Sequence, residues 1–152
     1  MTDEDFMQKA IELGRTNPQH PFGAIIVDRS TEAVLAEGVN QSGSNPLFHG
    51  EIVAINNSVE QIADVNWSTL TLFTTAEPCP MCMSAILWCG IESVMFGTSI
   101  PTLIDLGWDQ IRMRATDVVQ QSHRPQTSVI GGLLESRCDD LFRLARQDSI
   151  PS

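Results

Sequence analysis

The spacing of apolar and polar positions predicts a chain that mixes helices and strands. Phe6, Ala10 and Leu13 recur at helical spacing, which predicts an amphipathic helix near the start of the chain. Gly14 is the expected C-cap of that helix. Short runs of β-forming residues bounded by Gly, Asp, Asn or Ser predict strands. The predicted helices are residues 2–14, 49–62, 78–89 and 135–146, and the predicted strands are residues 22–27, 33–39, 69–75, 91–96 and 127–130.

The lengths of the connections predict how these strands pair. Residues 28–31 are a polar turn between the first two strands, which is typical of a hairpin. Residues 98–126 hold two helical stretches, and a parallel crossover needs a dozen residues or more. The fourth and fifth strands are therefore predicted to run parallel. We expect one α/β domain over residues 1–152, a three-layer α/β/α sandwich in which helices cover both faces of a mixed five-stranded sheet.

The charge balance limits the partners that the chain can bind. Its 152 residues include 19 Asp and Glu against nine Lys and Arg, a formal net charge of −10. Nucleic-acid binding depends on neutralising phosphates, so a large nucleic-acid surface is disfavoured. Arg112, Arg114 and Arg124 leave a small basic patch open. No apolar run approaches the ~18 residues of a membrane span, and the acidic start is unlike a signal peptide, so we expect a cytoplasmic protein with no membrane partner.

The four cysteines divide into two groups. Cys79 and Cys82 form a C-x-x-C motif, which indicates metal or redox chemistry. Cys89 and Cys138 lie in apolar helical contexts and are interpreted as packing residues. A disulfide framework is the less favoured interpretation in a chain without a secretory signal.

Two short motifs carry the candidate chemistry. His49-Gly50-Glu51 and the segment 78–82, Pro-Cys-Pro-Met-Cys, together match the H-x-E…P-C-x-x-C pattern of zinc-dependent deaminases. Zinc takes imidazole and thiolate ligands, and His49, Cys79 and Cys82 supply three, which leaves the fourth tetrahedral position to water. Glu51 is suited to carry protons between that water and a substrate.

The positions of the ligands in the predicted helices support this hypothesis. Both ligand groups fall at helix starts, where unpaired N–H groups and the helix dipole favour thiolates. A lone C-x-x-C is also typical of a redox pair or of half a zinc ribbon, but neither gives His49 or Glu51 a role. No second C-x-x-C or H-x-H completes a closed structural site. The non-enzymatic alternative is a zinc-stabilised pseudo-enzyme that binds a base or a partner protein.

The chain resembles the cytidine deaminase superfamily over nearly its whole length. Within it, the chain is similar to the branch of guanine deaminases, tRNA adenosine deaminases and fungal-type cytosine deaminases, which share a long helical crossover. Gly50 departs from the Ala usual in bacterial guanine and tRNA deaminases and agrees with the fungal-type enzymes. The segments that carry the resemblance are residues 21–24 (PFGA), 38–40 (GVN), 49–51 (HGE), 75–82 (TAEPCPMC) and 84–88 (SAILW).

The resemblance implies a role for each matching residue and an oligomeric state for the protein. It implies a homodimer and one Zn²⁺ per chain, with Glu51 as the proton shuttle. Asn40 matches a residue that hydrogen-bonds the substrate, and the segment from Phe22 to Ala24 matches a wall of the base pocket. The implied zinc ligands are His49, Cys79 and Cys82.

The substrate is predicted from the crossover and from the charge. Leu106-Gly107-Trp108-Asp109 lies where bacterial guanine deaminases carry a segment that closes over the base. Asp109 is a suitable acceptor for the adjacent N–H donors of guanine, and Trp108 or Trp88 could stack on its ring; the same segment is also typical of a packed corner. We predict a hydrolytic deaminase of guanine or a related purine or heterocycle.

Two other substrates stay open. The segment 130–135 and the last helix look similar to tRNA adenosine deaminases, although the acidic chain lacks the phosphate-neutralising residues that tRNA binding needs. Cytosine is the other alternative, because Gly50 agrees with the fungal-type cytosine deaminases.

Overall fold

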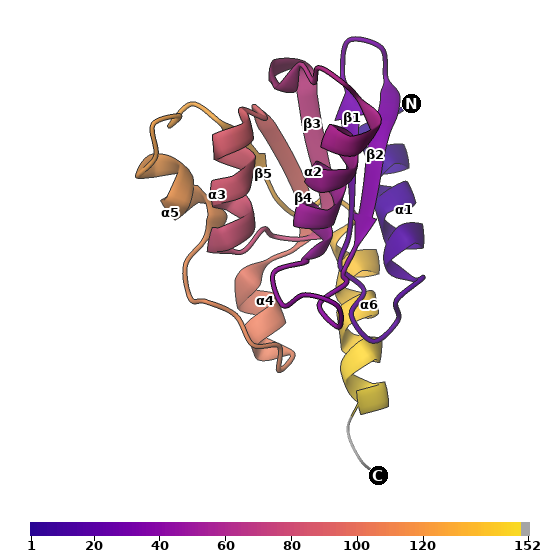
Figure 1. Ribbon diagram of the computed structural model, residues 1–152. Coiled ribbons are helices and arrows are strands. Elements are labelled where there is room, and N and C mark those ends of the chain that lie inside the picture. The colour runs from indigo at the N-terminus through magenta and orange to yellow at the C-terminus, as the bar shows by residue number, and fades with distance from the viewer. Residues whose placement is uncertain (150–152) are drawn as a thin grey trace.

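The computed structural model describes residues 1–149, and its centre is one mixed sheet of five strands (Figure 1). The strand order across the sheet is β2-β1-β3-β4-β5. β1 pairs antiparallel with β2 and with β3, whereas β3, β4 and β5 run parallel to one another. The strands are β1 (Gly23–Asp28), β2 (Ala33–Val39), β3 (Leu70–Ala76), β4 (Ser93–Thr98) and β5 (Ser128–Ile130). The predicted hairpin and the predicted parallel pairing of the last two strands are both confirmed.

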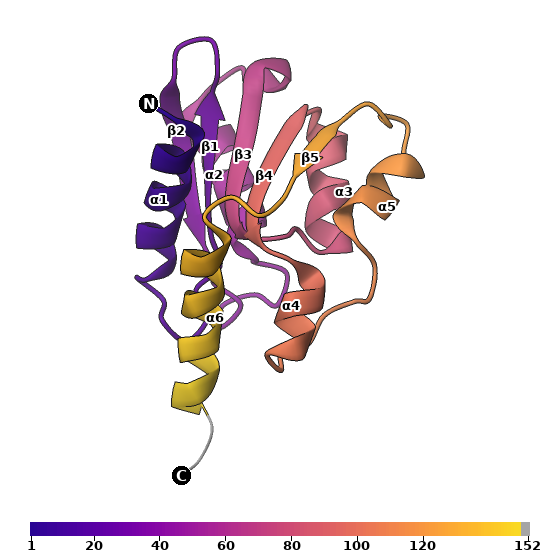
Figure 2. The same cartoon turned by 180° about the vertical axis from the view of Figure 1, so that it is seen from behind.

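Helices cover both faces of the sheet, as the two opposite views show (Figures 1 and 2). α2, α3 and α5 pack on one face, and α1 and α6 pack on the other. The helices are α1 (Asp3–Gly14), α2 (Gly50–Gln61), α3 (Pro80–Cys89), α4 (Ile100–Asp105), α5 (Ala115–Gln120) and α6 (Glu135–Ser149), with a short 3-10 helix at Trp67–Thr69. The predicted three-layer sandwich is therefore confirmed.

The sheet is buried on both faces because each face meets helices. All seven residues of β3 are buried, as expected for a central strand between two helical layers. Leu72 and Val94 pack against α2, α3 and α5 on one side. On the other side, Phe73 packs with Phe6 of α1. This packing fixes the helices that begin at the carboxyl end of the sheet.

Two helix ends behave differently, although both involve glycine. Gly90 ends α3 in the left-handed conformation, with φ 91°, which is typical of a glycine C-cap. Gly14 is instead the last residue of α1, and Arg15 is the C-cap in a right-handed conformation, so the predicted cap role of Gly14 is wrong. Gly14 is needed because a Cβ there would lie 2.7 Å from the carbonyl oxygen of Pro21.

The crossover from β4 to β5 brings its central loop to the edge where α2 and α3 begin. It contains α4, a loop over residues 106–114 and α5. The loop turns through Gly107 at φ 93°, a conformation that glycine adopts without strain. Within residues 1–149, no helix combines the length and the apolarity that a bilayer span requires.

Candidate metal centre and base cavity

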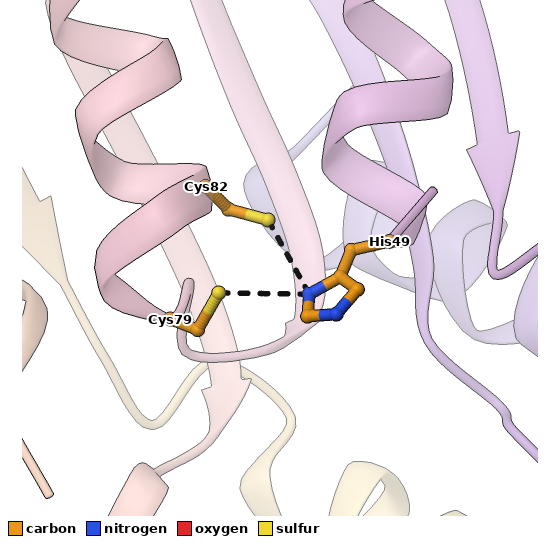
Figure 3. Close-up of side chains that lie close together, drawn as sticks. All are labelled: His49, Cys79 and Cys82. Carbon is orange, nitrogen blue, oxygen red and sulfur yellow. Dashed lines mark hydrogen bonds between the residues drawn. The ribbon is translucent and has the colours of Figure 1, made fainter. Parts of the chain in front are cut away.

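The three predicted metal ligands come together at the starts of two neighbouring helices (Figure 3). His49 is the N-cap of α2, and Cys79 is the N-cap of α3. Cys82 lies in the first turn of α3, where Pro80 at the helix start fixes the backbone. Each helix follows a strand of the sheet, so the packed sheet sets the distance between the two helix starts.

The spacing of the donor atoms fits zinc. His49 Nδ1 lies 3.5 Å from Cys79 Sγ and 3.6 Å from Cys82 Sγ, and all three donor atoms lie within 4.8 Å of one another. Tetrahedral zinc with ordinary Zn–N and Zn–S bonds separates an imidazole nitrogen from a thiolate sulfur by about 3.6 Å. One imidazole and two thiolates are also ligands that zinc prefers, so these residues are arranged to hold one zinc ion.

Glu51 places a buried carboxyl group beside this cluster without joining it. The residue lies in the first turn of α2 and is 4% exposed. Burial is the main cause that raises the pKa of Glu51, to about 7, and the charge of Cys79 adds to it. A carboxyl group with a pKa near neutral can both accept and release a proton, which is the property of a general acid and base.

Hydrogen bonds among the three metal ligands shift the pKa of each of them. The hydrogen bond from the Cys82 thiol is the main cause that lowers the pKa of Cys79, to about 4. The same contact, with burial, raises the pKa of Cys82 well above its ordinary value. The hydrogen bond with Cys79 also raises the pKa of His49. Zinc binding must therefore displace a proton from Cys82.

We expect the apparent zinc affinity to rise with pH across the neutral range. Protons compete with zinc for Cys82, whose raised pKa keeps the thiol protonated at neutral pH, so the association constant should rise about tenfold per pH unit for each proton displaced. Competition with a chromophoric chelator between about pH 6 and pH 8 measures this slope. A zinc affinity that does not change over that range would contradict the proposed ligand set.

A cavity of about 130 Å³ adjoins the cluster. It is smaller than the roughly 300–1,000 Å³ of sites for drug-sized ligands, so its size suits one small heterocycle. A second, more apolar hollow of about 420 Å³ shares four residues with it, including Asp109 and Gln110, and extends along Leu47 and Ile111. The cavity is lined by Phe22, Asn40, His49, Glu51, Glu77, Cys79, Trp108, Asp109 and Gln110.

Asn40 lies in this cavity with its side-chain orientation fixed. Its side-chain oxygen accepts hydrogen bonds from the backbone N–H and the hydroxyl of Ser42, at 3.0 and 2.8 Å. Its backbone N–H donates to the carbonyl oxygen of Phe22 at 3.0 Å. Because the oxygen of the amide is engaged, its NH₂ group is the part that can donate to an acceptor on a base.

Trp108 forms a wall of the cavity and is anchored by α6. Its indole N–H donates to the carbonyl oxygen of Phe142 at 3.2 Å, and its ring meets Phe22 edge to face at 5.2 Å. The guanidinium of Arg146 lies 4.2 Å from the centre of the indole ring and donates to the carbonyl oxygen of Gly107 at 2.7 Å. The predicted neighbour of the base, Asp109, follows this anchored residue and also lines the cavity.

Two residues predicted to bind substrate lie outside this cavity. Ala24 is fully buried in the core between the sheet and α2. Trp88 is 78% exposed on α3, with its ring 5.0 Å from that of His123. It lines a separate groove between α3 and α5. Of the two tryptophans predicted to stack on a base, Trp108 is the one at the cavity.

The structure adds two cavity residues that sequence reasoning missed. Glu77 and Gln110 line the cavity beside the predicted residues. Glu77 carried a signal, because an acidic residue follows the wholly buried strand β3 and precedes the ligand segment. A carboxylate that is buried after such a strand needs hydrogen-bond donors from other parts of the chain to compensate its charge. Gln110 lies in an irregular loop and carried no comparable signal.

Comparison with known proteins identifies a family. The model of the cytidine and deoxycytidylate deaminase zinc-binding region matches residues 1–98. That range contains Glu51 and all three ligands of the candidate metal centre. The matched region ends at the last residue of β4, before the loop that carries Trp108 and Asp109.

The curated relatives differ in the substrates that their names give. A tRNA-specific adenosine deaminase from Rickettsia bellii is 33% identical over 93 residues, 60% of this chain and 64% of its own length. A probable cytosine deaminase from Schizosaccharomyces pombe is 35% identical over 107 residues, 68% and 65% of the two chains. Guanine deaminase from Bacillus subtilis is 30% identical over 115 residues, 72% of each chain. The chain thus matches less than two thirds of the length of the first two relatives.

Solved structures share the fold. NE0047 in complex with 2,6-diaminopurine superposes with a TM-score of 0.84 at 25% identity, covering 96% of this chain and 82% of the other. The crystal structure of Bacillus subtilis guanine deaminase gives a TM-score of 0.64 at 31% identity, covering 72% and 73% of the two chains.

Proposed function

The chain belongs to the cytidine and deoxycytidylate deaminase family, and from this premise we propose that it hydrolyses the amino group of a free nucleobase, guanine or a related purine or heterocycle. The observation that carries the proposal is the buried carboxyl group of Glu51 beside a three-ligand zinc centre, at a cavity of about 130 Å³. The lining of the cavity combines a proton shuttle with polar and aromatic groups that can hold a polar ring.

The residues of the chain divide the reaction between them. Zinc held by His49, Cys79 and Cys82 supplies the Lewis acidity that makes water nucleophilic at neutral pH. Glu51 accepts a proton from the attacking water and passes it to the ring nitrogen next to the carbon that bears the amine. The water oxygen adds to that carbon as a hydroxyl group. Glu51 then takes the remaining proton of this hydroxyl and delivers it to the amine, so that the C–N bond breaks and a carbonyl is left. One water is consumed and one ammonia is released.

The other polar and aromatic groups that line the cavity favour an aminopurine. The amide NH₂ of Asn40 can donate to a ring nitrogen or carbonyl, and the carboxylate of Asp109 can accept from adjacent N–H groups. Guanine presents both kinds of group. Trp108 supplies an aromatic wall whose orientation α6 fixes.

The charge distribution favours a free base over tRNA. The net charge is −10, and two of the three arginines that could make a basic patch are engaged by carboxylates. Arg114 donates to Glu77 at 3.0 Å, and Arg124 lies 3.7 Å from Glu92. Phosphate neutralisation is the main source of nucleic-acid affinity, so a tRNA stem-loop lacks its principal contact here.

Ammonia release from a panel of compounds tests this function. The zinc-loaded protein is assayed with guanine, adenine, cytosine, their nucleosides, other amino-substituted heterocycles and an adenosine-containing tRNA anticodon stem-loop. We expect guanine or a related free heterocycle to be turned over. Turnover of the stem-loop alone would assign the tRNA-specific activity instead, and zinc binding with no turnover of any compound would favour the pseudo-enzyme.

We expect Asp109→Ala to impair guanine turnover selectively. Loss of hydrogen bonds from a buried substrate N–H to a charged acceptor costs about 1.5–3 kcal/mol, so kcat/KM for guanine should fall about 10- to 100-fold. Adenine lacks the adjacent N–H donors of guanine, so any turnover of adenine should change much less. Steady-state kinetics on both bases measure the difference. An unchanged kcat/KM for guanine removes Asp109 from the site.

We further propose that the protein acts as a cytoplasmic homodimer. Trp88 and Met113 are large apolar side chains that stay exposed beside the groove between α3 and α5, and burying them against a second copy would be favourable. Light scattering coupled to gel filtration measures the oligomeric state.

A further inference from the structure

Glu77 carries a buried carboxylate that the proposed reaction does not use. Its side chain is 1% exposed. One carboxylate oxygen accepts the backbone N–H of Ile100 at 2.9 Å, and the other accepts the backbone N–H of Ala115 at 2.8 Å. The Nε of Arg114 donates to both oxygens at 3.0 Å. A charge this deeply buried is retained only where hydrogen bonds compensate it, and here four do.

These contacts join three segments that are distant in the sequence. Ile100 is the first residue of α4, and Ala115 is the first residue of α5. Glu77 itself lies two residues before the zinc ligand Cys79. The carboxylate therefore ties both helices of the crossover to the segment that enters the metal centre.

The part of the crossover that lines the cavity lies between two anchors. At one end, Trp108 is held by α6 through its indole N–H. At the other end, Arg114 and Ala115 are held by Glu77. The stretch between them, residues 109–113, has no helix or strand of its own. Both ends of this stretch are therefore fixed by contacts to other parts of the chain.

We propose that Glu77 and Arg114 form a clamp that positions residues 109–113, the cavity wall with Asp109 and Gln110, for base binding. Glu77 is a positioning residue in this proposal, and the part that concerns the base rests on the proposed function. Glu51 and the zinc ligands lie at the starts of α2 and α3, and the core that packs these helices on the sheet contains none of residues 109–113. Loosening the clamp should therefore weaken base binding more than it slows the chemical step.

Limited proteolysis with trypsin tests whether the clamp holds residues 109–113 in place, and it needs no substrate. Arg112 lies in the wall, and cleavage after it requires the chain to open locally. We expect Glu77→Gln and Arg114→Ala each to accelerate cleavage after Arg112 about tenfold or more, while cleavage after Arg15 keeps its rate. The rate then reports the population of the opened wall. Arg114 is 47% exposed, so Arg114→Ala keeps the test valid where the variant at the buried carboxylate fails to fold.

Kinetics separate positioning from a purely structural role. With the compound that the substrate panel identifies, we expect both variants to raise KM about tenfold or more and to change kcat much less, at unchanged zinc content. Arg114→Lys keeps the charge but lacks the guanidinium geometry, so its KM should lie between those of the wild type and Arg114→Ala. Glu92→Gln is the matched control, because Glu92 pairs with Arg124 of the same crossover away from the cavity. It should leave KM and cleavage unchanged.

Three results would overturn the proposal. Unchanged cleavage after Arg112 in both variants would show that the clamp does not hold the wall. Faster cleavage with unchanged KM would assign the clamp a structural role only. A raised KM in Glu77→Gln alone, with wild-type cleavage, would mean that Glu77 contacts the base directly. If no compound is turned over, the proposed function fails, whereas trypsin cleavage still decides whether Glu77 holds the wall.

Discussion

Replacing Glu51 by Gln should remove nearly all turnover while zinc stays bound. The amide keeps the size of the side chain, so the buried position next to the metal centre stays filled. It cannot accept and return a proton, and positioned proton transfer contributes about 10²–10⁴ to a rate. Because Glu51 serves both the water and the amine in the proposed reaction, we expect kcat to fall about 10³-fold or more.

The measurement pairs kcat with zinc content by mass spectrometry. Glu60→Gln is the matched control, because Glu60 lies on the same helix in an exposed position. It should retain wild-type turnover. Wild-type turnover in Glu51→Gln would falsify the proton-shuttle assignment, and loss of zinc from that variant would show that Glu51 supports the metal centre.

Replacing Cys82 by Ala should abolish zinc binding and, with it, turnover. Cys82 is fully buried and supplies one of only two thiolates in the cluster. Structural sites in small peptides bind zinc with an apparent free energy of about 10–16 kcal/mol. Removing one of three protein ligands should remove a large part of such a binding free energy. We expect zinc content to fall from about one ion per chain toward zero after dialysis, with activity lost in proportion.

The other free cysteines supply the control for this experiment. Cys89 lies at the far end of α3 from the cluster and packs partly buried against the core. Cys89→Ala should keep zinc and turnover, with at most a modest fall in melting temperature. Retention of one zinc ion in Cys82→Ala would contradict the ligand set.

Much of the fold followed from local sequence pattern. The helix over residues 135–146 was predicted from its amphipathic spacing, and α6 occupies that range and three further residues. The fourth strand was predicted at residues 91–96, whereas β4 is Ser93–Thr98. The shift arises because Gly90 ends α3 and the next two residues complete the turn before Ser93 pairs with Thr71. The ends of a strand are set by its hydrogen-bond partners on the neighbouring strands. The hydrophobic periodicity of the sequence carries no information about those partners.

The cavity was predicted less completely than the metal centre. Both Trp88 and Trp108 are predicted as residues that could stack on a base, and Trp88 is the one predicted to bind substrate. Only the packing of α6 on Trp108 places that ring at the cavity, whereas Trp88 points from α3 toward His123. Glu77 belongs to a motif segment of the sequence, but its role depends on Arg114, which is 37 residues away. The sequence pattern does not pair residues at that distance.

The sequence by itself determined the helices, most strands and the set of zinc ligands. These features depend on side-chain chemistry and on spacing over a few residues, which is what His49, Cys79 and Cys82 at two helix starts provide. The tertiary structure alone decided the walls of the cavity. Trp108 is held by α6, and Arg114 and Ala115, which follow residues 109–113, are held by the carboxylate of Glu77. Such contacts form between residues tens of positions apart, where the packing of the sheet and its helices fixes the distance.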